Sequence, residues 1–182
     1  MRARRDMTSP ADYRVAETLR NGLAVTIRAL RPDDREKIAK AIRELDRESI
    51  YLRLFSYRNL LTESALDRVM HFDPAGEVVL IVTRGSGADE IVIGSGRYIV
   101  GPGGHGSRSA EVAFMVEEDY HGLGIASRLL KHLAEVARGQ GITAFDATVL
   151  PENKAMLSVF ARSGLSMRKC NEGGEVHVTL TL

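Results

Sequence analysis

The sequence of 182 residues contains a single cysteine, Cys170. One cysteine excludes an internal disulfide framework and any metal site built from several cysteine ligands. Cys170 is not placed like a nucleophile, and we expect it to be a small packing residue. The lack of a cysteine pair favours a reducing, cytoplasmic setting, and no metal ion is expected.

Long hydrophobic runs are also missing. No apolar segment approaches the roughly 20 residues of a membrane span, and the basic start MRARRDMTSPADYR lacks the apolar stretch of a secretory signal. The protein is therefore expected to be soluble, without a membrane partner. Residues 1–20 are polar, contain Pro10 and show no periodicity, so they are predicted to form a flexible arm. A nucleic-acid tail is the alternative, which Asp6, Asp12 and Glu17 disfavour by diluting the charge.

The sequence also lacks an excess of positive or negative charge. The chain has 25 basic and 24 acidic residues and a formal net charge of +1. This balance provides no broad electrostatic surface for nucleic acid, so neither nucleic acid nor anionic membrane is an expected partner. Any bound anion must therefore be held by a few groups at one site. With 44% hydrophobic residues, the chain is long enough for one ordinary core, and residues 21–182 are predicted to form a single domain.

Periodicity and capping residues predict a mixed α/β domain. The segment 23–30 alternates and is rich in β-branched residues, as a strand should be, and Pro32 starts a helix directly after it. The expected order is a strand at 23–30, helices at 31–45 and 61–72, three strands at 77–84, 90–100 and 110–116, a helix from 125 to about 139, a strand at 142–150, a helix at 152–164 and one or two final strands reaching 182. This order predicts a mixed sheet with helices on both faces.

The segment VEEDYHGLGIASRLLKHL combines a strand end, a turn and an amphipathic helix. Gly122 and Gly124 allow a ligand to approach the backbone, and the first amides of the helix would point at one spot. This pattern indicates a pyrophosphate site. No lysine followed by Ser or Thr is present, as a P-loop requires, and a dinucleotide fold would need a third glycine and an acidic partner downstream. A helix start that merely contains two glycines is the structural alternative.

A second segment supports the anion site. LPENKAMLSVFARSGL places Asn153 just inside a further helix, directly after a strand. Together with HGLGIA, this segment resembles the acyl-CoA signature of the GNAT superfamily of N-acyltransferases, Gln/Arg-x-x-Gly-x-Gly/Ala. In that pattern His121 takes the Gln/Arg place, Gly124 the central glycine and Ala126 the last small residue. The resemblance covers residues 23–182 and implies a GNAT fold with a central sheet of six to seven strands.

The resemblance also implies acetyl-CoA as cosubstrate and names its contacts. Backbone amides from Gly122 to Ser127 are expected to hold the pyrophosphate. The main chain of 114–116 would pair with the pantetheine arm, and Asn153 would contact that arm from the other side. Phe160 stands where many GNAT enzymes have a tyrosine; it cannot donate a proton, and it packs against either the pantetheine or the core. The implied cofactor-binding residues are Phe114, Met115, Val116, His121, Gly122, Leu123, Gly124, Ile125, Ala126, Ser127, Asn153 and Phe160.

A narrower resemblance links TIRALRPDD, RESIYLRLF, GSGRYIV and AEVAFMVEEDYHGLGIA to bacterial protein lysine acetyltransferases that modify acyl-CoA synthetases. In that group a glutamate at the start of the central strand is the proposed general base, and here it is Glu111. A carboxylate lodged in a partly apolar strand can accept the amine proton, and burial would raise its pKa toward a useful value. The structural alternative is a strand-end glutamate pointing to solvent.

The expected activity is therefore transfer of an acetyl group to a primary amine, with a protein lysine as acceptor and an acyl-CoA synthetase as the candidate protein. A small amine or amino acid is one alternative acceptor. A CoA-binding regulatory module without turnover is another possibility, motivated by Phe160 and by His121 in place of Gln/Arg. Either a monomer or a homodimer is expected. Four side chains after the first helix would touch the acceptor or cap the core: Tyr51, Arg53, Phe55 and Tyr57.

Overall fold

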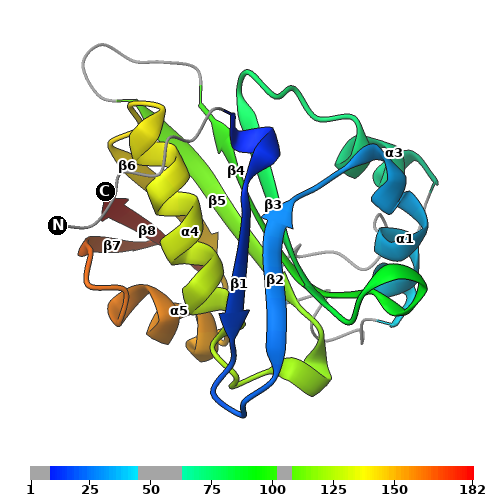
Figure 1. Ribbon diagram of the computed structural model, residues 1–182. Coiled ribbons are helices and arrows are strands. Elements are labelled where there is room, and N and C mark those ends of the chain that lie inside the picture. The colour runs from blue at the N-terminus through cyan, green and yellow to red at the C-terminus, as the bar shows by residue number, and fades with distance from the viewer. Residues whose placement is uncertain (1–8, 45–62, 102–107) are drawn as a thin grey trace, which may run out of the picture.

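A computed structural model describes residues 9–44, 63–101 and 108–182 of the chain (Figure 1). The described strands form one sheet of eight, in the order β1-β2-β3-β4-β5-β6-β8-β7. They are β1 (Arg14–Thr18), β2 (Ala24–Ala29), β3 (Glu77–Arg84), β4 (Ile91–Val100), β5 (Ser109–Val116), β6 (Ala144–Val149), β7 (Ser166–Glu172) and β8 (Glu175–Thr181). Only β5 and β6 pair in parallel; the other neighbours are antiparallel. The predicted mixed sheet is confirmed, but the predicted six to seven strands are too few.

The first strand corrects the prediction of a flexible arm at 1–20. A short 3-10 helix, η1 (Pro10–Asp12), leads into β1, which pairs with β2 along its whole length. Tyr13 and Leu19, on either side of β1, are buried. The sequence does not indicate this strand, because RVAET lacks the alternation of apolar and polar residues that is typical of a strand. In the structure its residues are alternately exposed and half-buried. Residues 10–20 therefore belong to the packed domain, while 1–8 lie outside the described residues.

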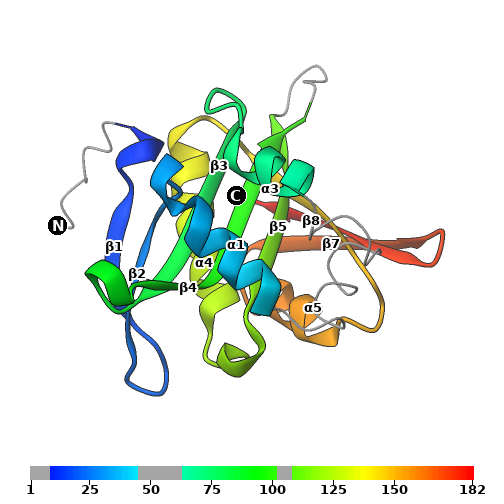
Figure 2. The ribbon, with the colours of Figure 1, turned by 90° about the vertical axis from the view of Figure 1, so that its right-hand side faces the viewer.

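Helices cover both faces of the sheet, as predicted. Figure 1 shows α4 (Ile125–Gly139) and α5 (Lys154–Ala161) on one face, and Figure 2 shows α1 (Arg35–Glu44) and α3 (Glu63–Met70) on the other. A large hydrophobic cluster lies under α4 and α5, and a smaller one lies under α1 and α3. None of the described helices is long and apolar enough to cross a membrane.

The long helix α4 lies close to the middle of the sheet. The predicted amphipathic character of this helix is confirmed, because Ile125, Leu129 and Leu133 on one of its faces are at most 2% exposed. Gly96 on β4 permits the close approach: a Cβ atom there would lie 3.0 Å from the ring of Phe114 and 3.1 Å from Leu133. Burial of each such aliphatic side chain contributes roughly 1.5–3 kcal/mol. The start of α4 is thus held in a fixed place beside the end of β5.

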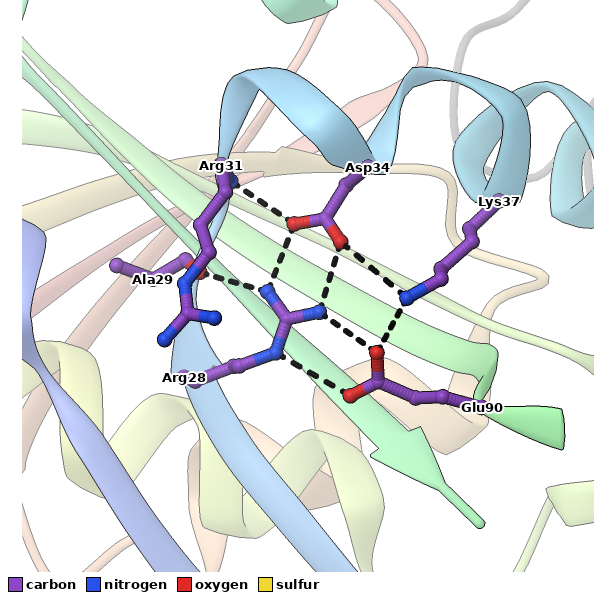
Figure 3. A network of polar contacts seen from close by, with 6 residues as sticks. All are labelled: Arg28, Ala29, Arg31, Asp34, Lys37 and Glu90. Atoms are coloured by element: carbon purple, nitrogen blue, oxygen red, sulfur yellow. Dashed lines mark hydrogen bonds and ion pairs between the residues drawn. The ribbon is translucent and has the colours of Figure 1, made fainter. Parts of the chain in front are cut away.

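A buried ion network fixes α1 to the sheet (Figure 3). Arg28 of β2 donates from both terminal nitrogens to the Asp34 carboxylate at 2.7 Å, and these side chains are 2% and 1% exposed. Glu90 accepts from Arg28 at 3.1 Å and from Lys37 of α1 at 2.5 Å. Burial by itself would raise the pKa of Glu90, but the hydrogen bonds from Lys37 and Arg28 outweigh it and lower the pKa to about 2. Glu90 is therefore ionised in the folded protein.

Candidate active site

The strands β5 and β6 separate part of the way along their length. β5 pairs with β4 up to Val116, but it pairs with β6 only at residues 109–111, opposite 144–146. Beyond that point β6 continues to Val149, bonded to β8 on its other edge. From residue 112 to 116 one edge of β5 thus has no strand partner within the described part of the chain. Such an edge can accept an extended ligand that carries amide groups.

The helix α4 starts where this edge ends. Its N-cap residue Gly124 has φ 87° and ψ 17°, the left-handed conformation that favours glycine, and no side chain of the described residues caps the helix. The first helical amides lack intrahelical acceptors and lie at the positive end of the helix dipole. The acidic residues before it are held in a separate turn, η4 (Glu118–Tyr120). The geometry therefore suits an anion at the start of α4.

His121 connects the strand end to this turn. Its Nε2 lies 3.0 Å from the backbone oxygen of Val116. Because a carbonyl oxygen can only accept, Nε2 carries the hydrogen and donates it. The residue at the Gln/Arg place of the pattern thus braces the turn between β5 and α4, and its ring is exposed.

Glu111 lies at the point where β5 and β6 part. It stands opposite Ile99 of β4 on one side and Asp146 of β6 on the other. Its neighbours in the strand, Ala110 and Val112, face the core under α4, so the Glu111 side chain is on the opposite face of the sheet. That side chain is exposed. The expectation of a buried carboxylate is therefore wrong: the partly apolar sequence around Glu111 reflects the buried alternate residues.

Asp146 is the residue near this point that the sequence reasoning missed. It is half-buried, and its Oδ1 accepts a hydrogen bond of 2.7 Å from the hydroxyl of Thr179 on β8. Two carboxylates thus lie side by side on parallel strands, where both side chains share one face. No motif marks Asp146, because its proximity to Glu111 depends on the strand register.

The helix α5 begins on the other side of the separation. Asn153 is its N-cap: the side-chain oxygen accepts from the backbone N–H of Met156 at 3.0 Å, which leaves the amide NH2 group for a ligand. Phe160 is only 1% exposed and meets Phe114 edge to face, with ring centroids 6.1 Å apart. Of the two predicted packing environments for Phe160, the core is the one observed. Its place among the cofactor contacts is thereby corrected.

The remaining predicted contacts lie on the same two segments. The side chains of Phe114 and Ile125 are buried, so only their main chain can meet a ligand. The other predicted positions are half-buried or exposed: Met115, Val116, Gly122, Leu123, Gly124, Ala126 and Ser127.

Three further expectations concern Cys170, the acceptor contacts at 51–57 and metal ions. Cys170 is exposed on the edge strand β7, so the prediction of a packing residue is wrong. The suggested acceptor contacts at 51–57 lie outside the described residues. Among the residues that the structure describes, no three His, Cys, Asp or Glu side chains gather in a way that could hold a metal ion.

Comparison with known proteins decides the family. Residues 40–165 match the model of the acetyltransferase (GNAT) family. The chain belongs to this family. It is 34% identical over 146 residues to Acetyltransferase Pat of Mycolicibacterium smegmatis, covering 80% of this chain and 42% of that protein. It is 27% identical over 140 residues to Acetyltransferase PA5475 of Pseudomonas aeruginosa, covering 77% of this chain and 74% of that protein. The chain thus spans less than half the length of the Mycolicibacterium relative.

Solved structures give the same family. The GNAT domain of S. lividans PAT has 34% identity and a TM-score of 0.82, covering 93% of this chain and 97% of that one. A cAMP-binding acyltransferase from Mycobacterium smegmatis has 29% identity and a TM-score of 0.62, covering 93% of this chain but 47% of that one. The GNAT fold expected from HGLGIA and ENKAMLSVFARSGL is confirmed. The similarity to Acetyltransferase Pat and to the GNAT domain of S. lividans PAT, together called the Pat group, supports the expected relationship to bacterial protein lysine acetyltransferases.

Proposed function

We propose that this GNAT domain transfers an acetyl group from acetyl-CoA to a primary amine, a lysine side chain of a protein, with Glu111 as general base. One observation carries the proposal: an edge of β5 without a strand partner among the described residues leads to a start of α4 that no described side chain caps. A ligand with an extended amide-containing arm and a pyrophosphate at its end spans both features. CoA has that construction.

The residues around the separation fit CoA chemically. The edge of β5 from 112 to 116 offers backbone donors and acceptors to the two amides of the pantetheine arm. The amides at the start of α4 suit the pyrophosphate, because they combine unpaired donors with the positive helix dipole. Asn153 offers an NH2 group from the α5 side. These contacts would place the thioester toward the separation of β5 and β6.

The reaction needs a base because lysine is protonated near neutral pH. With a pKa of about 10.4, only about one lysine side chain in two or three thousand is the neutral nucleophile at pH 7. A carboxylate that receives the amine proton, directly or through a water molecule, allows attack on the thioester carbonyl carbon as the C–N bond forms. Glu111 lies at the branch point of the two strands and is the candidate for this role.

The exposure of Glu111 favours a macromolecular acceptor. The carboxylate faces solvent on the side of the sheet opposite α4, and its neighbour Ile99 is 38% exposed. A lysine on a protein surface has a long flexible stem that can pass an apolar neighbour and bring its amine to an open carboxylate. Around the exposed Glu111, the described residues provide few side chains that could enclose a small amine.

The departing thiolate needs less assistance. The conjugate acid of a thiolate has a pKa of about 8.5, well below that of the amine, so the C–S bond can break without a positioned acid and the thiolate can take its proton from water. Phe160 supplies no proton and is enclosed in the core. Backbone N–H groups near the end of β5 are the available donors to the carbonyl oxygen as charge develops on it.

The relationship to the Pat group supports the proposed acceptor class. The similarity to Acetyltransferase Pat and to the GNAT domain of S. lividans PAT supports a protein lysine, and an acyl-CoA synthetase is the first candidate. The test is release of the CoA thiol from acetyl-CoA in the presence of an acyl-CoA synthetase, other proteins and small amines. Turnover with a protein acceptor is expected. Turnover with small amines alone would show that the acceptor is a small amine and not a protein lysine. CoA binding without turnover would favour a regulatory module.

A further inference from the structure

The turn between β1 and β2 is firmly held against α4. Leu19 is 3% exposed, and its N–H donates to the oxygen of Leu23 at 2.9 Å. Gly22 N–H donates back to the oxygen of Leu19 at 3.0 Å, which closes the turn around Arg20 and Asn21. Arg20 therefore has a fixed backbone position at the tip of this hairpin.

A polar cluster ties the hairpin to the side of α4. Arg128 donates to the Glu17 carboxylate at 3.2 Å and to the oxygen of Thr18 at 2.6 Å. His132 donates from Nε2 to Glu17 at 3.1 Å, and its Nδ1 lies 2.5 Å from the Tyr13 hydroxyl oxygen. Burial would raise the pKa of Glu17, but the contacts with His132 and Arg128 outweigh it and lower that pKa. The charge of Arg128 is thus already balanced by an ionised Glu17.

Arg20 extends from this hairpin to the start of α4. A Cβ atom on Gly124 would lie 3.4 Å from Nε of Arg20 and 2.8 Å from Nη1 of Arg128. Two guanidinium groups therefore lie beside the glycine that begins the helix. Arg20 is exposed and, unlike Arg128, makes no hydrogen bond or ion pair with any residue of the described part of the chain. Its donors and its charge remain available to a ligand.

We infer that Arg20 is a phosphate-binding residue, supplied by the N-terminal hairpin, for the CoA pyrophosphate held at the start of α4. This inference rests on the proposed function. The helix start offers amides and partial positive charge, but a pyrophosphate carries full negative charge that a guanidinium can neutralise with two parallel hydrogen bonds. Arg128 acts as a positioning residue, because its bonds to Glu17 and Thr18 hold the turn that presents Arg20.

The test compares CoA affinity of the whole chain and its variants by calorimetry. R20Q is expected to weaken CoA binding by about tenfold, and R20K by less, because lysine keeps the charge without the paired donors. R14Q is the matched control: Arg14 is an exposed arginine at the start of β1, away from the turn that carries Arg20, and CoA affinity should be unchanged. An unchanged melting temperature of R20Q shows that the variant is folded.

Ligand variants locate the contact. Dephospho-CoA lacks the 3′-phosphate but keeps the pyrophosphate, so R20Q should weaken its binding by the same factor. A loss seen with CoA but not with dephospho-CoA would overturn the pyrophosphate assignment in favour of the 3′-phosphate. Wild-type CoA affinity in R20Q would overturn the role of Arg20 and leave the proposed function standing. Failure of the unaltered protein to bind CoA would contradict the proposed function itself, and this inference with it.

Discussion

Glu111 on β5 and Asp146 on β6 face each other in the last paired register before the two strands separate. The two carboxylates differ in their surroundings: Glu111 is exposed, whereas Asp146 is half-buried and accepts a hydrogen bond from Thr179. A group that must collect a proton from an incoming amine needs accessible lone pairs. This difference favours Glu111 as the base and Asp146 as a neighbour with a structural hydrogen bond.

Replacement of Glu111 by glutamine should lower the turnover rate at neutral pH by about 100-fold, within the range that general-base catalysis contributes. Affinity for acetyl-CoA should stay nearly unchanged, because Glu111 lies at the opposite end of β5 from the start of α4. Steady-state kinetics with a protein acceptor, together with calorimetry, measure both quantities. Asp146→Asn is the matched control and should have a much smaller effect; equal losses in the two variants would count against Glu111 as the base.

Replacement of Gly124 by glutamate should abolish measurable CoA binding. The backbone there has φ 87°, and a side chain would enter the space beside two guanidinium groups and offer them a carboxylate in place of phosphate. Gly141→Glu is the control, since Gly141 has φ 75° and open space at the far end of the same helix. Both positions have a positive φ, so both variants carry backbone strain, and only Gly124→Glu should lose affinity in calorimetry. Retained affinity would mean that the phosphate lies elsewhere.

Replacement of His121 by alanine should raise the KM for acetyl-CoA by about 2- to 10-fold while leaving turnover at saturation close to wild type. The variant loses the hydrogen bond from Nε2 to the oxygen of Val116, and a neutral hydrogen bond contributes about 0.5–1.5 kcal/mol net. His121→Gln keeps a donor of similar reach and should recover part of the loss. A drop in turnover of both variants at saturating acetyl-CoA would instead indicate that His121 takes part in the chemistry.

The buried network around Arg28 predicts a stability that depends on pH. The folded pKa of Glu90, about 2, lies below its ordinary value of 4.5. Its contribution is therefore fully present above pH of about 4.5 and is lost as the pH falls toward 2. Glu90→Gln should lower the free energy of unfolding by about 1 to 3 kcal/mol at pH 7, and the difference from wild type should shrink in acid.

Urea unfolding at several pH values measures this dependence. Glu44→Gln is the control, because Glu44 is an exposed residue on α1 whose ion pair with Lys40 spans 3.9 Å. Such a surface pair contributes at most about 1 kcal/mol, and its loss should be small at every pH. A Glu90→Gln deficit that stays constant from pH 7 to 3 would show that an uncharged contact, rather than the ionised carboxylate, stabilises the fold.

The parts of the fold that follow regular patterns could be predicted from the sequence. The amphipathic segment from residue 125 predicted α4, whose Ile125, Leu129 and Leu133 are buried, and the strands predicted at 77–84, 90–100 and 110–116 correspond to β3, β4 and β5. β1 escaped prediction because its residues are mostly polar and its order comes from pairing with β2 and from contacts with α4.

The candidate site divides in the same way. The glycine turn, His121 and Asn153 form local motifs that a sequence displays. Asp146 and Arg20 come near the site only through strand register and through the docking of a hairpin on α4, two relationships between segments far apart in the chain. Burial was also misjudged for Glu111, since alternate residues of a strand face opposite sides.

The most direct test of acetyl transfer to a protein lysine is mass spectrometry of an acyl-CoA synthetase after incubation with this protein and isotope-labelled acetyl-CoA. We expect labelled acetyl groups on specific lysine side chains, greatly reduced with Glu111→Gln and absent without the protein. Failure to label any lysine of the synthetase or of other proteins, by a chain that binds CoA and is folded, would contradict the proposed activity.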